Sequence, residues 1–237
     1  MADWKAKRFW KAAAVAQTDD GYAVHLDGRA VKTPAKQALI VPTQAMAAAI
    51  AEEWDAQVDV INPNTMPVTK TANAAIDKVT VQHAEVAEML AAYGDSDLLC
   101  YRADAPEELV ARQAAHWDPL LDWAADALGA RLLTRTGVMH IPQDGAAVAT
   151  LRHRTFALDA FELAAFHDLV SMSGSLVLGF AAALDARPAD AVWTLSRLDE
   201  LWQEEQWGED EDATALAEVK RIAFLHAKRM FDLAKTR

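Results

Sequence analysis

The residues best placed by type and spacing to do chemistry lie near the middle of the chain. His116 lies close to Asp118 and Asp122, and the two aspartates stand one helical turn apart, a spacing that can hold a divalent cation. Pro119 falls between them and disturbs the helical geometry that would bring them together. We therefore expect no metal site here, and keep a metal-dependent enzyme centred on His116, Asp118 and Asp122 as an alternative hypothesis.

Sequence motifs of the common enzyme classes are absent. The chain contains no GxGxxG, P-loop, HExxH, GxSxG or EF-hand pattern, so nucleotide, hydrolase and calcium-binding functions lack their usual support. Cys100 stands beside Leu98, Leu99 and Tyr101, which favours a buried thiol over a reactive one. We expect no catalytic residues and no cofactor.

The most unusual stretch is 195–213, with the sequence LSRLDELWQEEQWGEDEDA. It gathers eight carboxylates around Trp202 and Trp207, and Arg197 is its one basic residue. One interpretation is a helix that buries its leucines, solvates its acids and ends at Gly208. The other is a docking surface for a protein partner, with Trp207 exposed, since tryptophan is enriched at interfaces. The pattern alone favours the first interpretation.

Composition and charge narrow the class of protein. The chain has 237 residues, 52% of them hydrophobic, which is enough for one large domain or two small ones. Its net charge of −12 argues against nucleic-acid binding. The single cysteine and the lack of an apolar signal run predict a cytoplasmic protein. The apolar segment 169–184 is too short to cross a bilayer, so we expect a buried helix and no membrane insertion.

The order of predicted elements changes from strands to helices along the chain. Alternating residues predict strands at 9–16 and 22–26, and Asp27-Gly28 is a two-residue hairpin signal. Thr43 is the predicted N-cap of a helix over 44–57.

The fold class predicted from this order is α+β, with a small β-rich N-terminal domain and a larger all-α C-terminal domain. We place the first domain at 1–90, with one or two helices, and the helical domain, which carries the acidic motif, at 91–237. Residues 131–141 are the one later stretch with a strand pattern, and they are expected to return to the first domain.

Long and unusual motifs carry a resemblance to a known family. The chain resembles the "ATP twelve" family of ATP synthase assembly chaperones, which act on the α subunit of the catalytic head. One small departure is Val68, where the family pattern has leucine. The motifs are RFWK at 8–11, LDGRAVKTP at 26–34, IAEEWDAQ at 50–57, MPVTKTANAAID at 66–77, DLLCYRA at 97–103, RQAAHWDPLLDW at 112–123, GSLVLGFA at 174–181 and the acidic stretch.

The resemblance implies a non-enzymatic chaperone that binds the free α subunit of F-type ATP synthase and shields its β-facing interface until the hexamer assembles. Because the chain lacks the presequence of the mitochondrial matrix relatives, the resemblance is to a bacterial, cytoplasmic member. A regulatory module that binds the intact synthase remains a further alternative. The partner-binding residues that the resemblance implies are Asp199, Glu200, Gln203, Glu205, Trp207 and Asp210.

Overall fold

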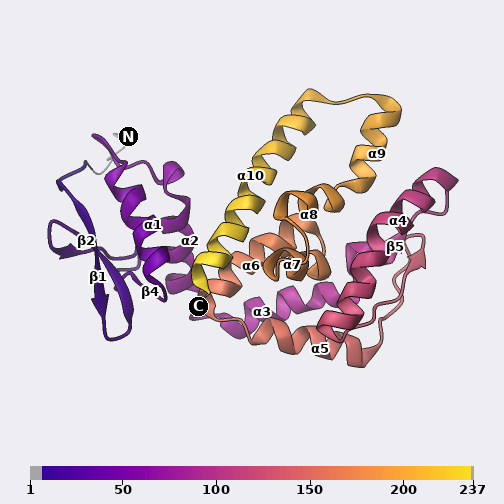
Figure 1. Ribbon diagram of the computed structural model, residues 1–237, viewed down its shortest axis with the longest axis horizontal. Helices are drawn as coiled ribbons and strands as arrows, with labels where there is room; N and C mark the ends of the chain where they lie inside the picture. The colour runs from indigo at the N-terminus through magenta and orange to yellow at the C-terminus, as the bar shows by residue number, and fades with distance from the viewer. Residues whose placement is uncertain (1–6, 236–237) are drawn as a thin grey trace. The chain divides into compact units, whose positions relative to one another are not determined.

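The structure is a computed structural model that describes residues 7–235 (Figure 1). These residues group by their contacts into two compact units. Unit 1 comprises residues 7–83, 160–165 and 229–235, and unit 2 comprises 84–159 and 166–228. The predicted α+β class is confirmed, because strands come first and helices make up most of the chain after them. The predicted domains are continuous stretches, whereas unit 1 also takes residues from two later helices.

A small antiparallel sheet forms the start of unit 1, with β2 pairing with each of the other three strands. Asp27 and Gly28 both have positive φ, 47° and 81°, as a two-residue hairpin turn requires. The hairpin predicted from these two residues is therefore confirmed. The strands are β1 (Ala13–Thr18), β2 (Gly21–Leu26), β3 (Arg29–Ala30) and β4 (Ile40–Val41).

Helix α1 (Gln44–Asp55) covers this sheet through contacts with β1 and β2. Its predicted N-cap is confirmed, since the Thr43 hydroxyl accepts a hydrogen bond from the Met46 N–H at 3.1 Å. Met46 and Ile50 are fully buried beneath it. The local capping signal and the apolar spacing thus fix the first helix of unit 1.

Helix α2 (Pro67–Ala74) begins against a carboxylate from α1. Glu53 accepts hydrogen bonds from the Val68 and Thr69 N–H groups at 2.7 and 2.8 Å, and from the Thr69 hydroxyl. An acid in this position satisfies orphan N–H groups and interacts favourably with the helix dipole. The helix continues as a π-helical turn over Ala75–Val79.

Unit 2 is almost entirely helical. Among residues 7–235 no helix is both long and apolar enough to cross a membrane. Helices α6 and α10 belong partly to each unit, and α3 begins at His83, the last residue of the first segment of unit 1. The helices are α3 (His83–Ala91), α4 (Glu107–Trp123), α5 (Gly145–Phe156), α6 (Ala160–Ser173), α7 (Leu176–Ala183), α8 (Ala189–Ser196), α9 (Leu198–Trp207) and α10 (Glu211–Ala234).

The apolar segment 169–184 is buried, as predicted, but it forms parts of two helices. Gly174 has φ +69° and ends α6, and the Ser175 hydroxyl caps α7. At Gly179 an added Cβ would lie only 2.6 Å from a methyl carbon of Val170, so glycine permits the close approach of these helices.

Asp97 fixes the start of α7 from a distant part of the chain. Its carboxylate is fully buried and accepts hydrogen bonds from the Ser175 hydroxyl at 2.7 Å and from the Leu99 and Val177 N–H groups at 3.0 Å. Burial raises the pKa of this carboxyl, and the surrounding donors oppose that shift.

One expectation from the sequence is wrong. Residues 131–141 do not return to the first sheet: they contribute β6 (Arg135–Thr136), which pairs in parallel with β5 (Tyr101–Arg102) inside unit 2. The pattern misleads because most of its apolar side chains, including Val138, remain exposed. The sequence leaves open whether Pro119 kinks its helix or divides it in two, and α4 runs through this residue undivided.

Candidate protein-interaction surface

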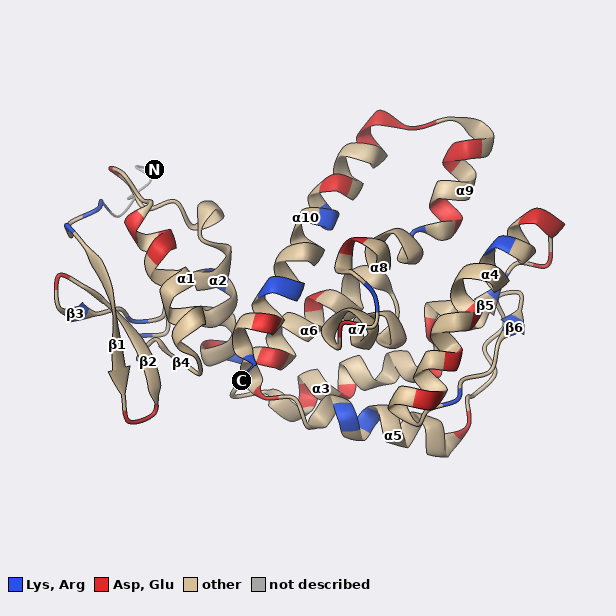
Figure 2. Ribbon diagram, in the orientation of Figure 1, with Lys and Arg blue, Asp and Glu red and all other residues tan. Residues whose placement is uncertain are grey.

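Helices α9 and α10 form a helical hairpin whose turn is set by two residues. Gly208 ends α9 with a φ of +92°, a conformation that glycine adopts without strain. The Asp210 carboxylate then accepts a hydrogen bond from the Ala213 N–H at 2.9 Å, which caps the start of α10. Figure 2 shows acidic residues along α9 and through the turn into α10. The sequence thus places an acidic turn between two helices.

One face of α9 is fastened to α4. The Asp199 carboxylate accepts a hydrogen bond from the buried Gln113 amide at 2.7 Å. Glu205 pairs with the Arg112 guanidinium at 2.8 Å, and this hydrogen bond lowers the pKa of Glu205. The same guanidinium lies over the Trp202 ring, 4.7 Å from its centroid. These contacts orient α9 with its opposite face outward.

The outward face presents Glu200, Gln203 and Trp207. They follow i, i+3, i+7 spacing and therefore lie on one stripe of the helix. The side chains of all three form no hydrogen bond or ion pair within residues 7–235, and Trp207 is 79% exposed. A large exposed indole among unpaired polar groups is typical of a surface that meets a partner.

Helix α10 adds apolar side chains that the sequence analysis did not single out. Leu216, Val219 and Ile222 are 55%, 64% and 58% exposed. The signal that could have found them is their position off the buried stripe of α10, which includes Ala217 and Phe224. Exposed large apolar residues grouped on one element indicate an interaction site more often than scattered ones do.

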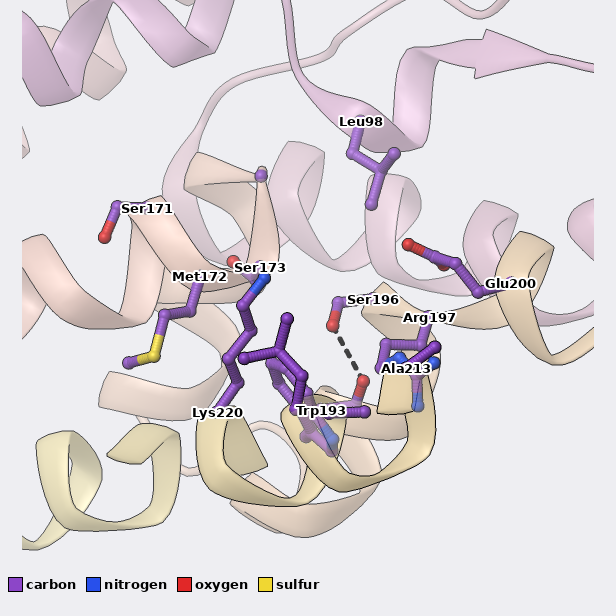
Figure 3. Close-up of a pocket in the computed structure, with 13 residues that line it drawn as sticks. Leu98, Ser171, Met172, Ser173, Trp193, Ser196, Arg197, Glu200, Ala213 and Lys220 are labelled. Atoms are coloured by element: carbon purple, nitrogen blue, oxygen red, sulfur yellow. Dashed lines mark hydrogen bonds between the residues drawn. The ribbon is translucent and has the colours of Figure 1, made fainter. Parts of the chain in front are cut away.

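A groove of about 370 Å³ lies between these helices, with the end of α6 and part of α8 also lining it. Figure 3 shows Glu200 and Lys220 among its walls, together with Met172 and Trp193. Leu216 lines the groove and is still more than half exposed. The groove thus combines an apolar lining with one acidic group, Glu200, and two basic groups, Arg197 and Lys220. It can receive a side chain of a protein partner.

The six residues predicted from the family resemblance fall into two groups. Asp199, Glu205 and Asp210 have intramolecular hydrogen-bond partners and hold the hairpin in place. The second group has no such partner among the described residues and faces outward. Its members are Glu200, Gln203 and Trp207.

The alternative metal site does not form. Asp118 pairs with the Arg102 guanidinium at 2.7 Å, and Asp122 lies 3.6 Å from the Arg131 guanidinium. Within residues 7–235, no group of three or more His, Cys, Asp or Glu side chains could hold a metal ion. The positions that the sequence suggests for metal ligands, which also include His116, therefore do not form a cation site.

Comparisons with known proteins agree on the class of protein. The family model described as ATP12 chaperone protein matches residues 7–125, half of the chain. The chain belongs to the ATP12 chaperone family.

The individual relatives span bacteria and a yeast. The solved structure of Atp12 from Paracoccus denitrificans is 48% identical, with a TM-score of 0.96 over 98% of this chain and 100% of that one. A lysine-for-aspartate mutant of the same protein matches equally well, over 99% of this chain and 100% of that chain. The mitochondrial protein atp12 of Schizosaccharomyces pombe is 27% identical over 219 residues, which cover 87% of this chain and 75% of the relative.

Proposed function

We propose that this chain is an assembly chaperone of F-type ATP synthase that binds the free α subunit and shields its β-facing interface until the hexamer assembles. Membership of the ATP12 chaperone family supports this proposal at the level of a chaperone. The family resemblance of the sequence motifs supplies the α subunit as client. A cytoplasmic location in a bacterium is part of the same proposal.

The observation that carries the proposal is the outward stripe of α9 beside the exposed apolar residues of α10. A free subunit of an obligate oligomer exposes an extended apolar interface that is prone to wrong association. Trp207 and Leu216 can cover part of such an interface, while Glu200 meets a basic group at its edge. The surface thus offers apolar contact and charge together, as protein interfaces require.

The residues of the hairpin have two different roles in binding: some contact the client and others position the helices. Glu200, Gln203 and Trp207 contact the client, because no internal partner competes for them among residues 7–235. Glu205 is half exposed, so it can meet a client cation while Arg112 orients it. Asp199 and Asp210 act by positioning, through the hydrogen bonds that set the orientation of α9 and the start of α10.

Release of the client needs no nucleotide in this proposal. The β subunit displaces the chaperone by binding the same α-subunit surface more favourably, since the obligate interface is larger and more apolar than a transient one. Helix α9 buries only Leu198 fully, which suits a surface that must separate again.

The test is co-purification with separately expressed α and β subunits, read by size-exclusion chromatography. We expect a complex with free α that dissociates when β is added. Trp207→Ala is expected to weaken it about thirtyfold, as for an interface hot spot, and Glu200→Lys about tenfold.

Glu85→Lys is the matched control, because it makes the same charge change at an exposed position of α3. It should bind α as the wild type does. Undiminished binding by folded Glu200→Lys and Trp207→Ala variants would remove this surface from the site. Binding to assembled synthase without binding to free α would instead favour the regulatory module.

A further inference from the structure

A second, larger pocket lies in unit 1 and shares no residue with the α9–α10 surface. Its volume is about 630 Å³, and α1, α2 and the segment before β4 contribute to its walls. Apolar groups provide much of the lining, among them Pro34, Ile61, Met66 and Ala74. A pocket of this size and character can hold a bulky apolar side chain together with the backbone that carries it.

Two residues that line this pocket each carry a buried polar side-chain atom that has no hydrogen-bond partner within residues 7–235. These atoms are the indole Nε1 of Trp54, a donor, and the amide Oδ1 of Asn73, an acceptor. A buried polar group without a partner costs free energy, so native structures usually satisfy such groups or use them. A peptide backbone supplies the complement of both, because its C=O accepts and its N–H donates.

The charged groups of the pocket are predominantly basic. Lys32, Lys70 and Lys78 line it, are exposed, and form no ion pair with the described part of the chain. Asp77 also lines it, but its two oxygens accept hydrogen bonds from the Thr33 hydroxyl at 2.6 Å and the Ala35 N–H at 3.0 Å. Three unpaired ammonium groups around an apolar pocket favour an apolar ligand with flanking carboxylates.

We propose that this pocket binds an extended peptide segment in which an apolar side chain is flanked by acidic residues. The apolar side chain enters the pocket, the backbone pairs with Trp54 and Asn73, and the carboxylates meet the lysines. A simple anion satisfies only the lysines and leaves the apolar walls empty. This site is independent of the proposed α-subunit contact, since the two share no residue.

The experiment is an NMR titration of the full, ¹⁵N-labelled chain, read on its eight tryptophan indole signals. Trp54→Phe assigns the Trp54 signal by its disappearance. The probe is the peptide acetyl-Ser-Asp-Leu-Asp-Ser-amide. We expect a saturable downfield shift of the Trp54 indole proton, because that proton gains a hydrogen-bond acceptor.

Two control peptides test separately the contributions of the carboxylates and of the backbone N–H to binding. The peptide with lysines in place of the aspartates should bind about tenfold more weakly or not at all. The peptide with an N-methylated leucine should bind about fivefold more weakly, the size of one lost net hydrogen bond.

Variants test the pocket itself. Asn73→Ala should weaken binding about fivefold, and the double change Lys70→Glu with Lys78→Glu about tenfold or more. Lys11→Glu makes the same kind of charge change in unit 1 outside the pocket and should bind normally. The indole signals of the buried Trp10, Trp117 and Trp193 report in the same spectra that each variant is folded.

Three results would overturn the proposal. One is the absence of a saturable Trp54 shift with the acidic peptide. Another is equal affinity for the acidic and the basic peptide. The third is an equal shift with inorganic phosphate, which would make the pocket a simple anion site.

Discussion

The two units differ sharply in charge. By sequence, the segments assigned to unit 1 contain 12 Lys and Arg against 11 Asp and Glu, whereas those of unit 2 contain 11 against 24. The whole net charge of the chain thus resides in unit 2. The difference teaches that the acidic character is local, so that a net charge of −12 describes one part of the molecule and misleads about the other.

Both units nevertheless satisfy the free N–H groups at the start of a helix in the same way, with a carboxylate from another segment of the chain. In unit 1, Glu53 of α1 accepts hydrogen bonds at the start of α2. In unit 2, Asp97 does so at the start of α7, from a fully buried position. The two carboxylates differ in burial. Loss of a hydrogen-bond partner costs more at the buried Asp97, because no water can replace that partner.

The largest expected loss of stability comes from a substitution that disrupts the core of unit 2 alone. Trp117 is fully buried, and its indole N–H donates to the Leu195 carbonyl oxygen at 2.9 Å. We expect Trp117→Ala to lower the free energy of unfolding by about 3–5 kcal/mol, as for other large aromatic truncations. Hydrogen exchange should then speed up in α4 and α8, while the β1–β2 amides of unit 1 stay protected.

Cys100 gives a second measurement for that variant. The thiol lies in unit 2, is 1% exposed, and burial raises its pKa to about 12, so a thiol reagent reacts only when unit 2 opens. Faster labelling in Trp117→Ala is expected. Equal loss of protection in both units would show instead that they unfold as one.

The next largest losses of stability are expected when each of the two capping carboxylates, Asp97 and Glu53, is replaced by its amide. Asp97→Asn places an NH₂ group against N–H and O–H donors and should cost about 1–3 kcal/mol. Glu53→Gln makes the same change at a part-buried site and should cost about 1 kcal/mol. Urea unfolding of both variants measures the difference, and a larger loss for Glu53→Gln would contradict the role given to burial.

A smaller contribution to the free energy of unfolding depends on pH and comes from the pair of His167 and Asp168. The Asp168 carboxylate, 2.9 Å from the His167 ring nitrogen, raises the pKa of His167 above its ordinary value of 6.5. A raised histidine pKa contributes stability that is fully present below 6.5 and is lost as the pH rises through the raised value. The pair is half exposed, so its contribution should stay below about 1 kcal/mol.

The measurement is the free energy of unfolding of the wild type and of His167→Ala, at pH 6 and at pH 8.5. The destabilisation by the substitution should be greater at the lower pH. An equal difference at both values would mean that the pair adds no charge-dependent stability.

The smallest expected effect sharpens the distinction between folding and binding surfaces. Leu216→Ser removes an exposed apolar side chain from α10 and should change the free energy of unfolding by no more than about 0.5 kcal/mol. The same variant should bind the free α subunit more weakly in the co-purification assay. A large loss of stability would mean that Leu216 belongs to the core.

Local signals in the sequence determined much of the fold. The Thr43 cap, the Asp27-Gly28 turn and the end of α9 at Gly208 each depend on hydrogen bonds or dihedral angles within a few residues. The buried character of 169–184 follows from its composition. These features were predictable because the groups that make them are neighbours in the chain.

Only the tertiary structure decided the rest, because it depends on contacts between distant residues. Arg112 and Glu205 are 93 positions apart, and nothing local indicates that their pairing turns Glu200 and Trp207 outward. The unit 1 pocket is lined by residues of three separate motifs, 26–34, 50–57 and 66–77. From the sequence these motifs indicated only a family resemblance and no pocket. The strand pattern at 131–141 failed for the same reason, since its partner strand was fixed by long-range packing. A sequence states which side chains are available, and packing decides which of them remain without a partner.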